Sequence, residues 1–434
     1  MPSRPHLCAL LAATALLATP TLFATPTLFA TPAQAAPGQA ATPVPCPVAK
    51  APPLPGAKPL PPEPVPPPRP ADEPVVGGDA LGTSGLLVPA GSAPLPKTIS
   101  AQSWVLADLD SGEILAACAP HARHLPASTQ KLLTALTALP GLDPKQVVTI
   151  TAEDLAIEPG SSAVGLVKGG KYTVDTIALG MMLNSGNEAA NALARLAGGS
   201  KGIPGGIERM NAEAHRIGAL DTTAITANGL DGKGQFTSAY DLALIARADF
   251  ALPGFRRYTA TRSAVIPAQP PHFKAFQIQN DNRLLTSYPG AIGGKTGFTD
   301  LAQHTYMGAA QRNGRRLVVT MLRGQHRPQK LWQQGAALLD WGFALPRNAE
   351  PVGKLVSPED VAPRPSPAGG AAVPGSAAAL GARVPSGTYS LPELAAVGFA
   401  VGAAVLLLVT VVAMRLRVLR RRRRRAVRAA RVSF

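Results

Sequence analysis

The pattern of hydrophobic positions between residues 98 and 347 changes from strand-like to helix-like and back again. Residues 103–108 and 113–116 predict two strands joined by a turn. Apolar residues three and four apart then predict helices at 174–183, 188–196, 206–217 and 238–248. Strand-like segments return at 276–279, 291–297, 305–310 and 315–322, and 331–343 predicts a closing helix. We expect an α/β (α+β) domain in which both ends build one antiparallel sheet and the middle forms a helical subdomain.

A further helix is predicted at residues 132–139, where leucines and alanines at helical spacing would pack one face into a core. Ser128 lies at its N-terminal end, and Lys131 is three residues further on, on the same face. A buried lysine gives up its proton more easily, so its amine can accept the proton of a neighbouring hydroxyl. Because serine is also a common helix N-cap, Ser-x-x-Lys alone leaves both interpretations open.

Two short motifs follow, in loop and strand contexts. Ser185-Gly186-Asn187 falls between two predicted helices, where a hydroxyl can relay a proton and an amide can hold Lys131 and bind a substrate amide. The alternative is a Ser-Gly turn followed by a helix cap. Lys295-Thr296-Gly297, on a predicted edge strand, offers an ammonium and a hydroxyl to a substrate carboxylate, and its glycine leaves room for a peptide. By itself this motif could equally be a surface strand end.

With S-x-x-K, S-x-N and K-T-G in this order, the chain resembles the penicillin-recognising serine acyl-transferases. Over residues 98–347 it most resembles the D-alanyl-D-alanine carboxypeptidases of peptidase family S11, which are low-molecular-weight penicillin-binding proteins. The resemblance implies the transpeptidase/β-lactamase-like fold, with a five-stranded antiparallel sheet flanked by helices plus a helical subdomain. One departure is Gln303, which stands where the family usually has glycine. The segments that carry the resemblance, besides the three motifs, are 188–191, 228–231, 239–243, 282–285 and 288–290.

The resemblance also implies the chemistry. The protein would remove the terminal D-alanine from peptidoglycan stem pentapeptides ending in D-Ala-D-Ala. This reaction would be a step in cell wall biogenesis and the control of cell shape. The protein would also be acylated by β-lactam antibiotics. No cofactor and no metal is expected. The residues implied are Ser128 as nucleophile, Lys131 as general base, Ser185 as proton relay with Asn187, Lys295, Thr296 and Gly297 for substrate binding, and the backbone N–H of Phe298 beside that of Ser128 as the oxyanion hole.

Three other functions remain open at this stage. A D,D-endopeptidase or transpeptidase would use the same chemistry, and a catalytically silent, membrane-tethered wall-binding protein would keep the fold alone.

Rapid β-lactam hydrolysis would need a Glu-x-x-x-Asn loop between the second and third motifs. None of Glu188, Glu208 and Glu213 has an asparagine four residues on, so that activity is not expected.

The two ends of the chain predict export and anchoring. Residues 1–35 have an apolar stretch and end in Ala-Gln-Ala, as in a secretory signal peptide, although an uncleaved anchor would also begin this way. Residues 36–97 are rich in proline and predict a stiff, solvated arm, which serves as a spacer or as a ligand for a partner domain. Residues 348–393 predict a second spacer. Residues 394–414 lack any charge and, at about 31 Å of helix, can cross a bilayer.

The net charge of +16 is concentrated at the C-terminal end, because residues 415–434 hold ten arginines and no acid. After an apolar segment, such a run indicates a cytoplasmic tail at the inner membrane surface, with the catalytic domain outside the cell membrane. Nucleic acid is not an expected partner. Cys8 belongs to the predicted signal peptide, which leaves Cys46 and Cys118 as a candidate disulfide in an exported chain. No histidine or cysteine cluster has metal-ligand spacing.

Overall fold

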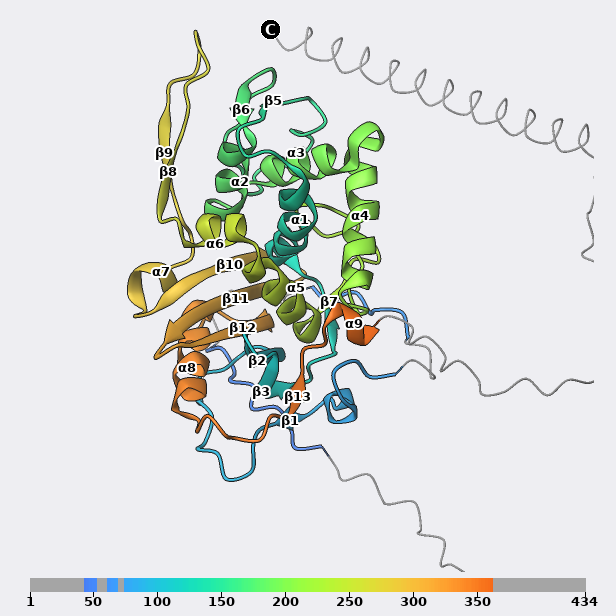
Figure 1. Ribbon diagram of the computed structural model, residues 1–434, viewed down its shortest axis with the longest axis vertical. Coiled ribbons are helices and arrows are strands. Elements are labelled where there is room, and N and C mark those ends of the chain that lie inside the picture. The colour runs from blue at the N-terminus through green and yellow to red at the C-terminus, as the bar shows by residue number, and fades with distance from the viewer. Residues whose placement is uncertain (1–42, 53–60, 69–73, 362–434) are drawn as a thin grey trace, which may run out of the picture. The chain divides into compact units, whose positions relative to one another are not determined.

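The fold is described from a computed structural model, which places residues 43–52, 61–68 and 74–361 (Figure 1). The predicted signal peptide (1–35), the apolar segment 394–414 and the arginine tail lie outside these residues, as does most of the predicted second spacer. Within the described ranges, none of the helices has the length and hydrophobicity needed to cross a bilayer.

A seven-stranded antiparallel sheet forms the base of the domain. Its order is β1 (Leu86–Leu87), β3 (Glu113–Cys118), β2 (Ser103–Asp108), β12 (Arg315–Gly324), β11 (Gln303–Arg312) and β10 (Ala291–Thr299), and β13 (Gly353–Lys354) also pairs with β3. The two ends of the domain therefore build one sheet, as predicted. The five longer strands match the five-stranded sheet that the resemblance implies. The two additional strands have only two residues each, too few to give a period-two pattern in sequence. The sixth predicted strand segment, 276–279, does not join this sheet and pairs in a separate two-stranded one.

The sheet is covered on both faces, so its central strands are buried throughout. Along β2, Trp104 and Leu106 belong to one hydrophobic cluster, and Val105 and Ala107 belong to the other. The first cluster includes α8 (Leu331–Ala344), which packs on β11 and β12, and the second joins the sheet to the helical layer (Figure 1). This alternation is the period of two expected for a strand between two apolar layers.

The helical layer contains α1 (Gln130–Ala138), α2 (Val174–Leu183), α3 (Asn187–Gly198), α4 (Gly202–Arg216) and α5 (Ala239–Ala251). All were predicted, and α2 has the predicted bounds. The expectation that α1 packs by one face was wrong, because only Thr137 among its nine residues escapes burial. It contacts α3, α4 and α5 at once, so it is the central helix of the layer.

Several short elements were not predicted. They are β4 (Arg123–His124) with β7 (Thr237–Ser238), β5 (Val147–Thr149) with β6 (Lys171–Thr173), β8 (Ser263–Ile266), α6 (Pro253–Ala260), α7 (Leu284–Ser287), α9 (Pro358–Val361) and four 3-10 helices. Strand β8 pairs with the predicted β9 (Phe276–Gln279) in a hairpin that projects from the body (Figure 1). The hairpin predicted at Asn313-Gly314 is confirmed, with both residues at positive φ.

The described parts of the proline-rich arm contact the domain at defined points. Within 43–52 and 61–68 most residues are exposed to solvent and none is buried. Cys46 and Cys118 are joined by a disulfide across 72 residues of sequence. The backbone N–H of Leu86 donates to the carbonyl of Val44 over 2.7 Å. Glu63 accepts a hydrogen bond from the Leu125 N–H at 3.0 Å and pairs with His124 and with Arg323. Proline prevents helix formation in the arm but does not prevent these side-chain and carbonyl contacts.

Candidate active site

The predicted nucleophile lies where the sheet meets the central helix. Ser128 is in the 3-10 turn Ala127–Thr129, directly before α1, and Ala127 has a positive φ of 46°. The segment that includes Gly229 passes so close that a side chain there would overlap the carbonyl oxygen of Ala127. A turn held in an unfavourable conformation by its surroundings is common where a reactive side chain must be presented.

Lys131 is fully buried and its ammonium nitrogen meets three oxygen atoms. Its Nζ lies 2.8 Å from Ser128 Oγ, 2.7 Å from Asn187 Oδ1 and 2.5 Å from the backbone oxygen of Asn228. The pairings with Ser128 and Asn187 were expected from sequence. The contact with Asn228 was not, because it depends on a loop 97 residues away. Asn228 falls within one of the segments that support the family resemblance.

Burial lowers the pKa of Lys131 well below its usual range, the charge of Lys295 lowers it further, and Glu188 acts in the opposite direction. A lysine with a lowered pKa is neutral in a larger fraction of molecules near neutral pH. The neutral amine can then take the proton of the serine hydroxyl 2.8 Å away.

Ser185 connects the second motif to the third. It has a positive φ of 58° in the short link between α2 and α3, and its Oγ accepts a hydrogen bond from Lys295 Nζ at 2.9 Å. Lys295 also donates to the backbone oxygen of Thr296 at 2.7 Å. Burial lowers the pKa of Lys295 to about 8, and Asp281 opposes that shift. The Lys295 ammonium is buried beneath the site, whereas Thr296 lines the active-site cavity described below.

The glycine of Lys295-Thr296-Gly297 has a steric reason different from the one expected. A side chain at Gly297 would lie 2.3 Å from Thr305 Oγ1 and 2.8 Å from the backbone nitrogen of Ser128. Strand β10 therefore runs directly beside the nucleophile turn, and only glycine fits there. The next residue, Phe298, has a half-exposed side chain whose ring centre lies 4.5 Å from that of His304.

An open cavity of about 440 Å³ unites the predicted residues that face solvent. It is lined by Ser128, Ser162, Ser185, Asp281, Arg283, Thr296, Gly297, Phe298, His304, Thr305, Tyr306, His326, Lys330, Leu331 and Trp332. A larger hollow of about 520 Å³ lies beneath α4 and α5 and contains none of the predicted catalytic groups. The site is therefore identified by its catalytic groups and not by cavity volume.

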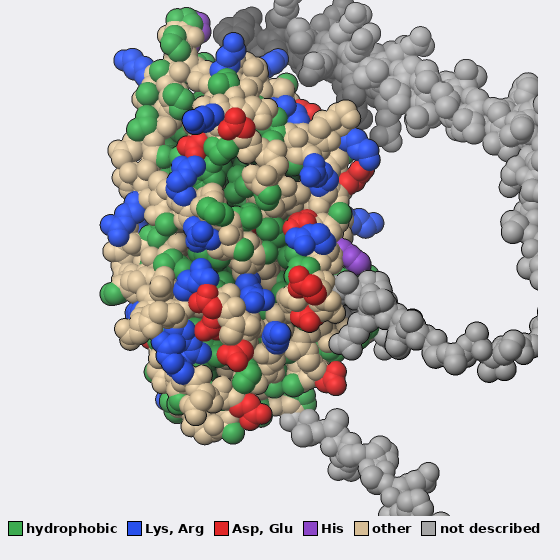
Figure 2. All heavy atoms as spheres, in the orientation of Figure 1, with side chains coloured by type: hydrophobic (Ala, Val, Ile, Leu, Met, Phe, Trp, Pro, Cys, Tyr) green, Lys and Arg blue, Asp and Glu red, His purple; other side chains and the backbone are tan. Residues whose placement is uncertain are grey.

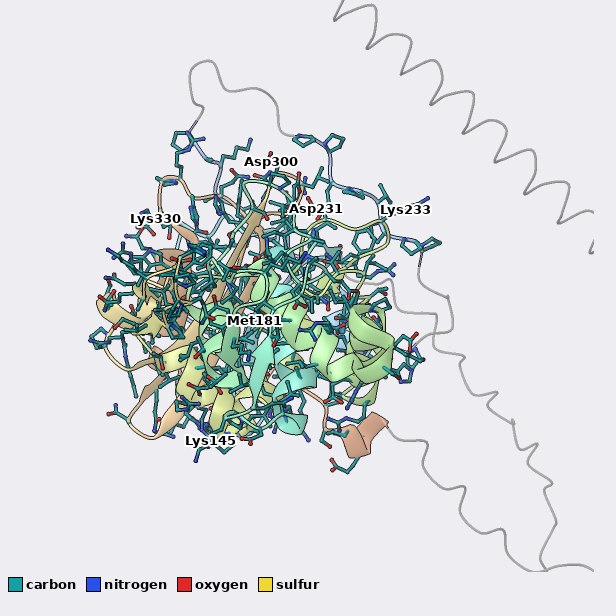
Figure 3. The ribbon with its side chains drawn as sticks, turned by 90° about the horizontal axis from the view of Figure 1, so that it is seen from above. Lys145, Met181, Asp231, Lys233, Asp300 and Lys330 are labelled. Atoms are coloured by element: carbon teal, nitrogen blue, oxygen red, sulfur yellow. A yellow bond between two sulfur atoms is a disulfide. The ribbon has the colours of Figure 1, made fainter. Side chains whose placement is uncertain are left out.

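Several lining residues were missed by sequence reasoning. His304 and His326 stack with their ring centres 3.3 Å apart, and burial lowers the pKa of His304 to about 3. Arg283 lies in a segment that supports the family resemblance, which is the only sequence signal for this group. In Figure 3, Asp231 and Asp300 lie together at one side of the domain and Lys330 lies further along the same side.

A group of three residues outside the cavity has ligand atoms within 4.8 Å of one another, namely His121, Asp221 and Asp241. Sequence spacing did not suggest it, because the residues come from three distant segments. His121 Nδ1 lies 2.8 Å from Asp221 Oδ2, and its Nε2 lies 3.0 Å from the backbone oxygen of Val76. Both imidazole nitrogens already have protein partners, so the group is explained as a hydrogen-bonded support between the chain segments.

On the face shown in Figure 2, lysines and arginines are dispersed among acidic side chains and do not form a continuous basic field. An extended phosphate backbone requires clustered positive charge. This face therefore gives no support to a nucleic-acid interface.

Residues 90–325 match the model of peptidase family S11, described as D-alanyl-D-alanine carboxypeptidase. The D-alanyl-D-alanine carboxypeptidase DacB2 of Mycobacterium tuberculosis is 44% identical over 271 residues, which are 62% of this chain and 90% of that protein. The D-alanyl-D-alanine carboxypeptidase DacD of Escherichia coli is 33% identical over 262 residues. That match covers 58% of this chain and 65% of DacD, slightly less than two thirds of it.

Solved structures give the same fold. A crystal structure of D-alanyl-D-alanine carboxypeptidase from M. tuberculosis H37Rv has a TM-score of 0.57 and 44% identity, and the match covers 62% of this chain and 99% of that one. The Streptomyces K15 DD-transpeptidase has a TM-score of 0.55 and 28% identity, with 58% of this chain and 100% of that one covered.

Proposed function

The chain belongs to the D-alanyl-D-alanine carboxypeptidase family of serine peptidases, and from that premise we propose that it removes the terminal D-alanine of peptidoglycan stem peptides through an acyl-enzyme on Ser128. The observation that carries the proposal is the 2.8 Å contact between Ser128 Oγ and the buried Nζ of Lys131. It supplies a nucleophile and a proton acceptor within hydrogen-bond reach.

In the acylation step, Ser128 Oγ attacks the carbonyl carbon of the penultimate D-alanine and its proton passes to the neutral Lys131 amine. The N–H groups of Ser128 and Phe298 stabilise the resulting oxyanion. The C–N bond then breaks, and the proton that Lys131 took from the serine passes through the Ser185 hydroxyl to the departing D-alanine amine, which returns Lys131 to its neutral form. Lys295 Nζ holds that hydroxyl in place. Water hydrolyses the ester in the second half-reaction and regenerates the serine.

The terminal carboxylate of the substrate is the part that Lys295 and Thr296 would recognise. Thr296 reaches the cavity directly, and the Lys295 ammonium contributes positive charge from below the cavity floor. Asn187 holds Lys131 and can also bind a substrate amide. A β-lactam, as a mimic of the same dipeptide, is expected to acylate Ser128 and to leave slowly.

The direct test is D-alanine release from a peptide ending in D-Ala-D-Ala by the purified chain. Ser128→Ala should abolish release, because no other group replaces the attacking oxygen. Ser287→Ala, which removes an exposed hydroxyl at the end of α7, should retain wild-type activity. Release that persists in Ser128→Ala would contradict the proposal.

Transpeptidation by the same acyl-enzyme is a second candidate, favoured by the similarity to the Streptomyces K15 DD-transpeptidase. The two reactions differ only in whether water or an amine attacks the ester. Incubation with an acceptor amine and mass analysis of the products separates them, and an endopeptidase would instead cleave crosslinked muropeptides. A silent wall-binding protein would give no product in any of these assays and no penicillin adduct.

We also propose that the catalytic domain is exported and held at the cell membrane by residues 394–414, with residues 415–434 in the cytoplasm. The support is the uncharged 21-residue segment followed by ten arginines. The full chain should remain in the membrane fraction after a high-salt wash, and a chain ending at residue 393 should be released. Retention of the shortened chain would refute this anchor.

A further inference from the structure

Glu188, the residue directly after Ser185-Gly186-Asn187, has an environment that the mechanism above does not explain. Its side chain is 1% exposed. One carboxylate oxygen, Oε1, accepts three backbone hydrogen bonds, from Val164 at 2.7 Å, Gly165 at 2.8 Å and Leu166 at 3.3 Å. Three donors converging on one oxygen is an arrangement suited to a negative charge.

These hydrogen bonds fix a loop that borders the active-site cavity. Ser162 lines the cavity, and its backbone oxygen accepts the Asn187 N–H at 2.9 Å. Two residues on, the side chain of Val164 occupies the space where Gly186 would carry a side chain, at 2.4 Å. The loop 162–166 and the second catalytic motif are therefore packed into one unit, with the Glu188 carboxylate at its centre.

The second carboxylate oxygen of Glu188 has no hydrogen-bond partner among the described residues, although it is buried. A buried charged oxygen without a donor is costly unless another charge compensates it. The acidic charge of Glu188 acts on Lys131, whose amine is surrounded by neutral oxygens and by the positive charge of Lys295. Glu188 also acts on Tyr172, on β6.

We propose that Glu188 is a positioning residue with two linked tasks: it anchors the substrate-side loop 162–166 to the second motif, and it supplies the negative charge that balances the buried Lys131. This inference rests on the proposed acyl-enzyme function of the same site. It explains why an acid, and not a neutral hydrogen-bond acceptor, stands at this buried position.

Glu188→Gln separates the two tasks, because its amide oxygen can still accept the loop hydrogen bonds while the charge is lost. Lys131 should then lose its proton at lower pH. In the pH profile of the rate of acylation by a fluorescent penicillin, the acid limb should therefore shift to lower pH by about one unit. The matched control is Glu208→Gln. Glu208 is an exposed acid on α4 that pairs with Lys201, and its substitution should leave the acid limb in place.

Glu188→Asp is the complementary variant, because it keeps the charge but shortens the reach to the loop by one methylene. Its acid limb should stay within a few tenths of a pH unit of wild type, whereas KM for a D-Ala-D-Ala peptide should rise roughly tenfold as the loop loosens. An unmoved limb in Glu188→Gln, or an unchanged KM in Glu188→Asp, would overturn the proposal. A wild-type chain that forms no penicillin adduct would instead refute the proposed function itself.

Discussion

The buried ammonium of Lys295 makes the activity sensitive to alkaline pH, and Asp281 offers a way to shift that sensitivity. Burial lowers the pKa of Lys295 to about 8, and the carboxylate of Asp281 raises it against that effect. In the proposed mechanism the charged form donates to Ser185 and attracts the substrate carboxylate. We therefore expect kcat/KM for D-alanine release to fall as pH rises through about 8.

Asp281→Asn removes the opposing carboxylate while keeping the shape of the side chain. The Asp281 side chain is exposed at the cavity wall, so its charge is partly screened by solvent. At an effective dielectric constant of about 20 or more, one such charge is worth roughly 0.5–1.5 kcal/mol, or roughly 0.4–1 pH unit. Without it the pKa of Lys295 falls, so the alkaline limb should move to lower pH by that amount.

The assay is the pH dependence of kcat/KM for D-alanine release, measured from pH 5 to 10 on purified wild type and variant. Glu350→Gln is the matched control, because this exposed acid lies outside the residues that line the cavity. An alkaline limb that stays in place in Asp281→Asn, or that moves to higher pH, would refute the electrostatic reasoning. A change in KM alone would indicate a substrate contact by Asp281 and not an effect on Lys295.

Three further substitutions or treatments test the packing around the site. Gly297→Ala should reduce the rate of penicillin acylation by about 100-fold or more, because a methyl group there overlaps the backbone nitrogen of Ser128. The control Gly254→Ala, in α6, has room for its methyl group and should acylate at the wild-type rate. Reduction of the Cys46–Cys118 disulfide should lower the free energy of unfolding by about 3–4 kcal/mol in denaturant titrations, and an unchanged midpoint would contradict it. Burial raises the pKa of the Asp249 carboxyl well above its usual value, so the folded state favours the protonated form. The folded state therefore loses stability as pH rises above the pKa of the unfolded chain. Asp249→Asn should raise the free energy of unfolding at pH 7.5 by about 1–2 kcal/mol, and no gain at that pH would contradict this sign.

Sequence reasoning predicted the elements whose pattern is local. The helix α2 and the hairpin between β11 and β12 follow from hydrophobic spacing and from the Asn-Gly turn, and both are confirmed. The two-residue strands β1 and β13 are too short to show a period, and they join the sheet only because the long strand β3 presents a free edge on which they pair. Gln303, noted as a departure from the usual glycine, adopts a positive φ of 60°, which explains the family's preference.

The site itself was only partly accessible from sequence. The three motifs could be located, and the contact between Ser128 and Lys131 follows from helix geometry alone. The link from Lys295 to Ser185 joins residues 110 apart, and the Asn228 carbonyl reaches Lys131 across 97 residues, so neither leaves a local pattern. The proline-rich composition of the arm predicts a solvated segment, so the contact of Glu63 with the segment before the nucleophile was not expected.

The central claim is that Ser128 is an activated nucleophile that forms an acyl-enzyme. Intact-mass spectrometry of the purified chain during a time course with penicillin measures that step most directly. We predict a long-lived adduct of one penicillin per chain that maps to the peptide containing Ser128 and is absent from Ser128→Ala. An adduct that persists in Ser128→Ala, or a wild-type chain that releases D-alanine and never acquires an adduct, would contradict the account.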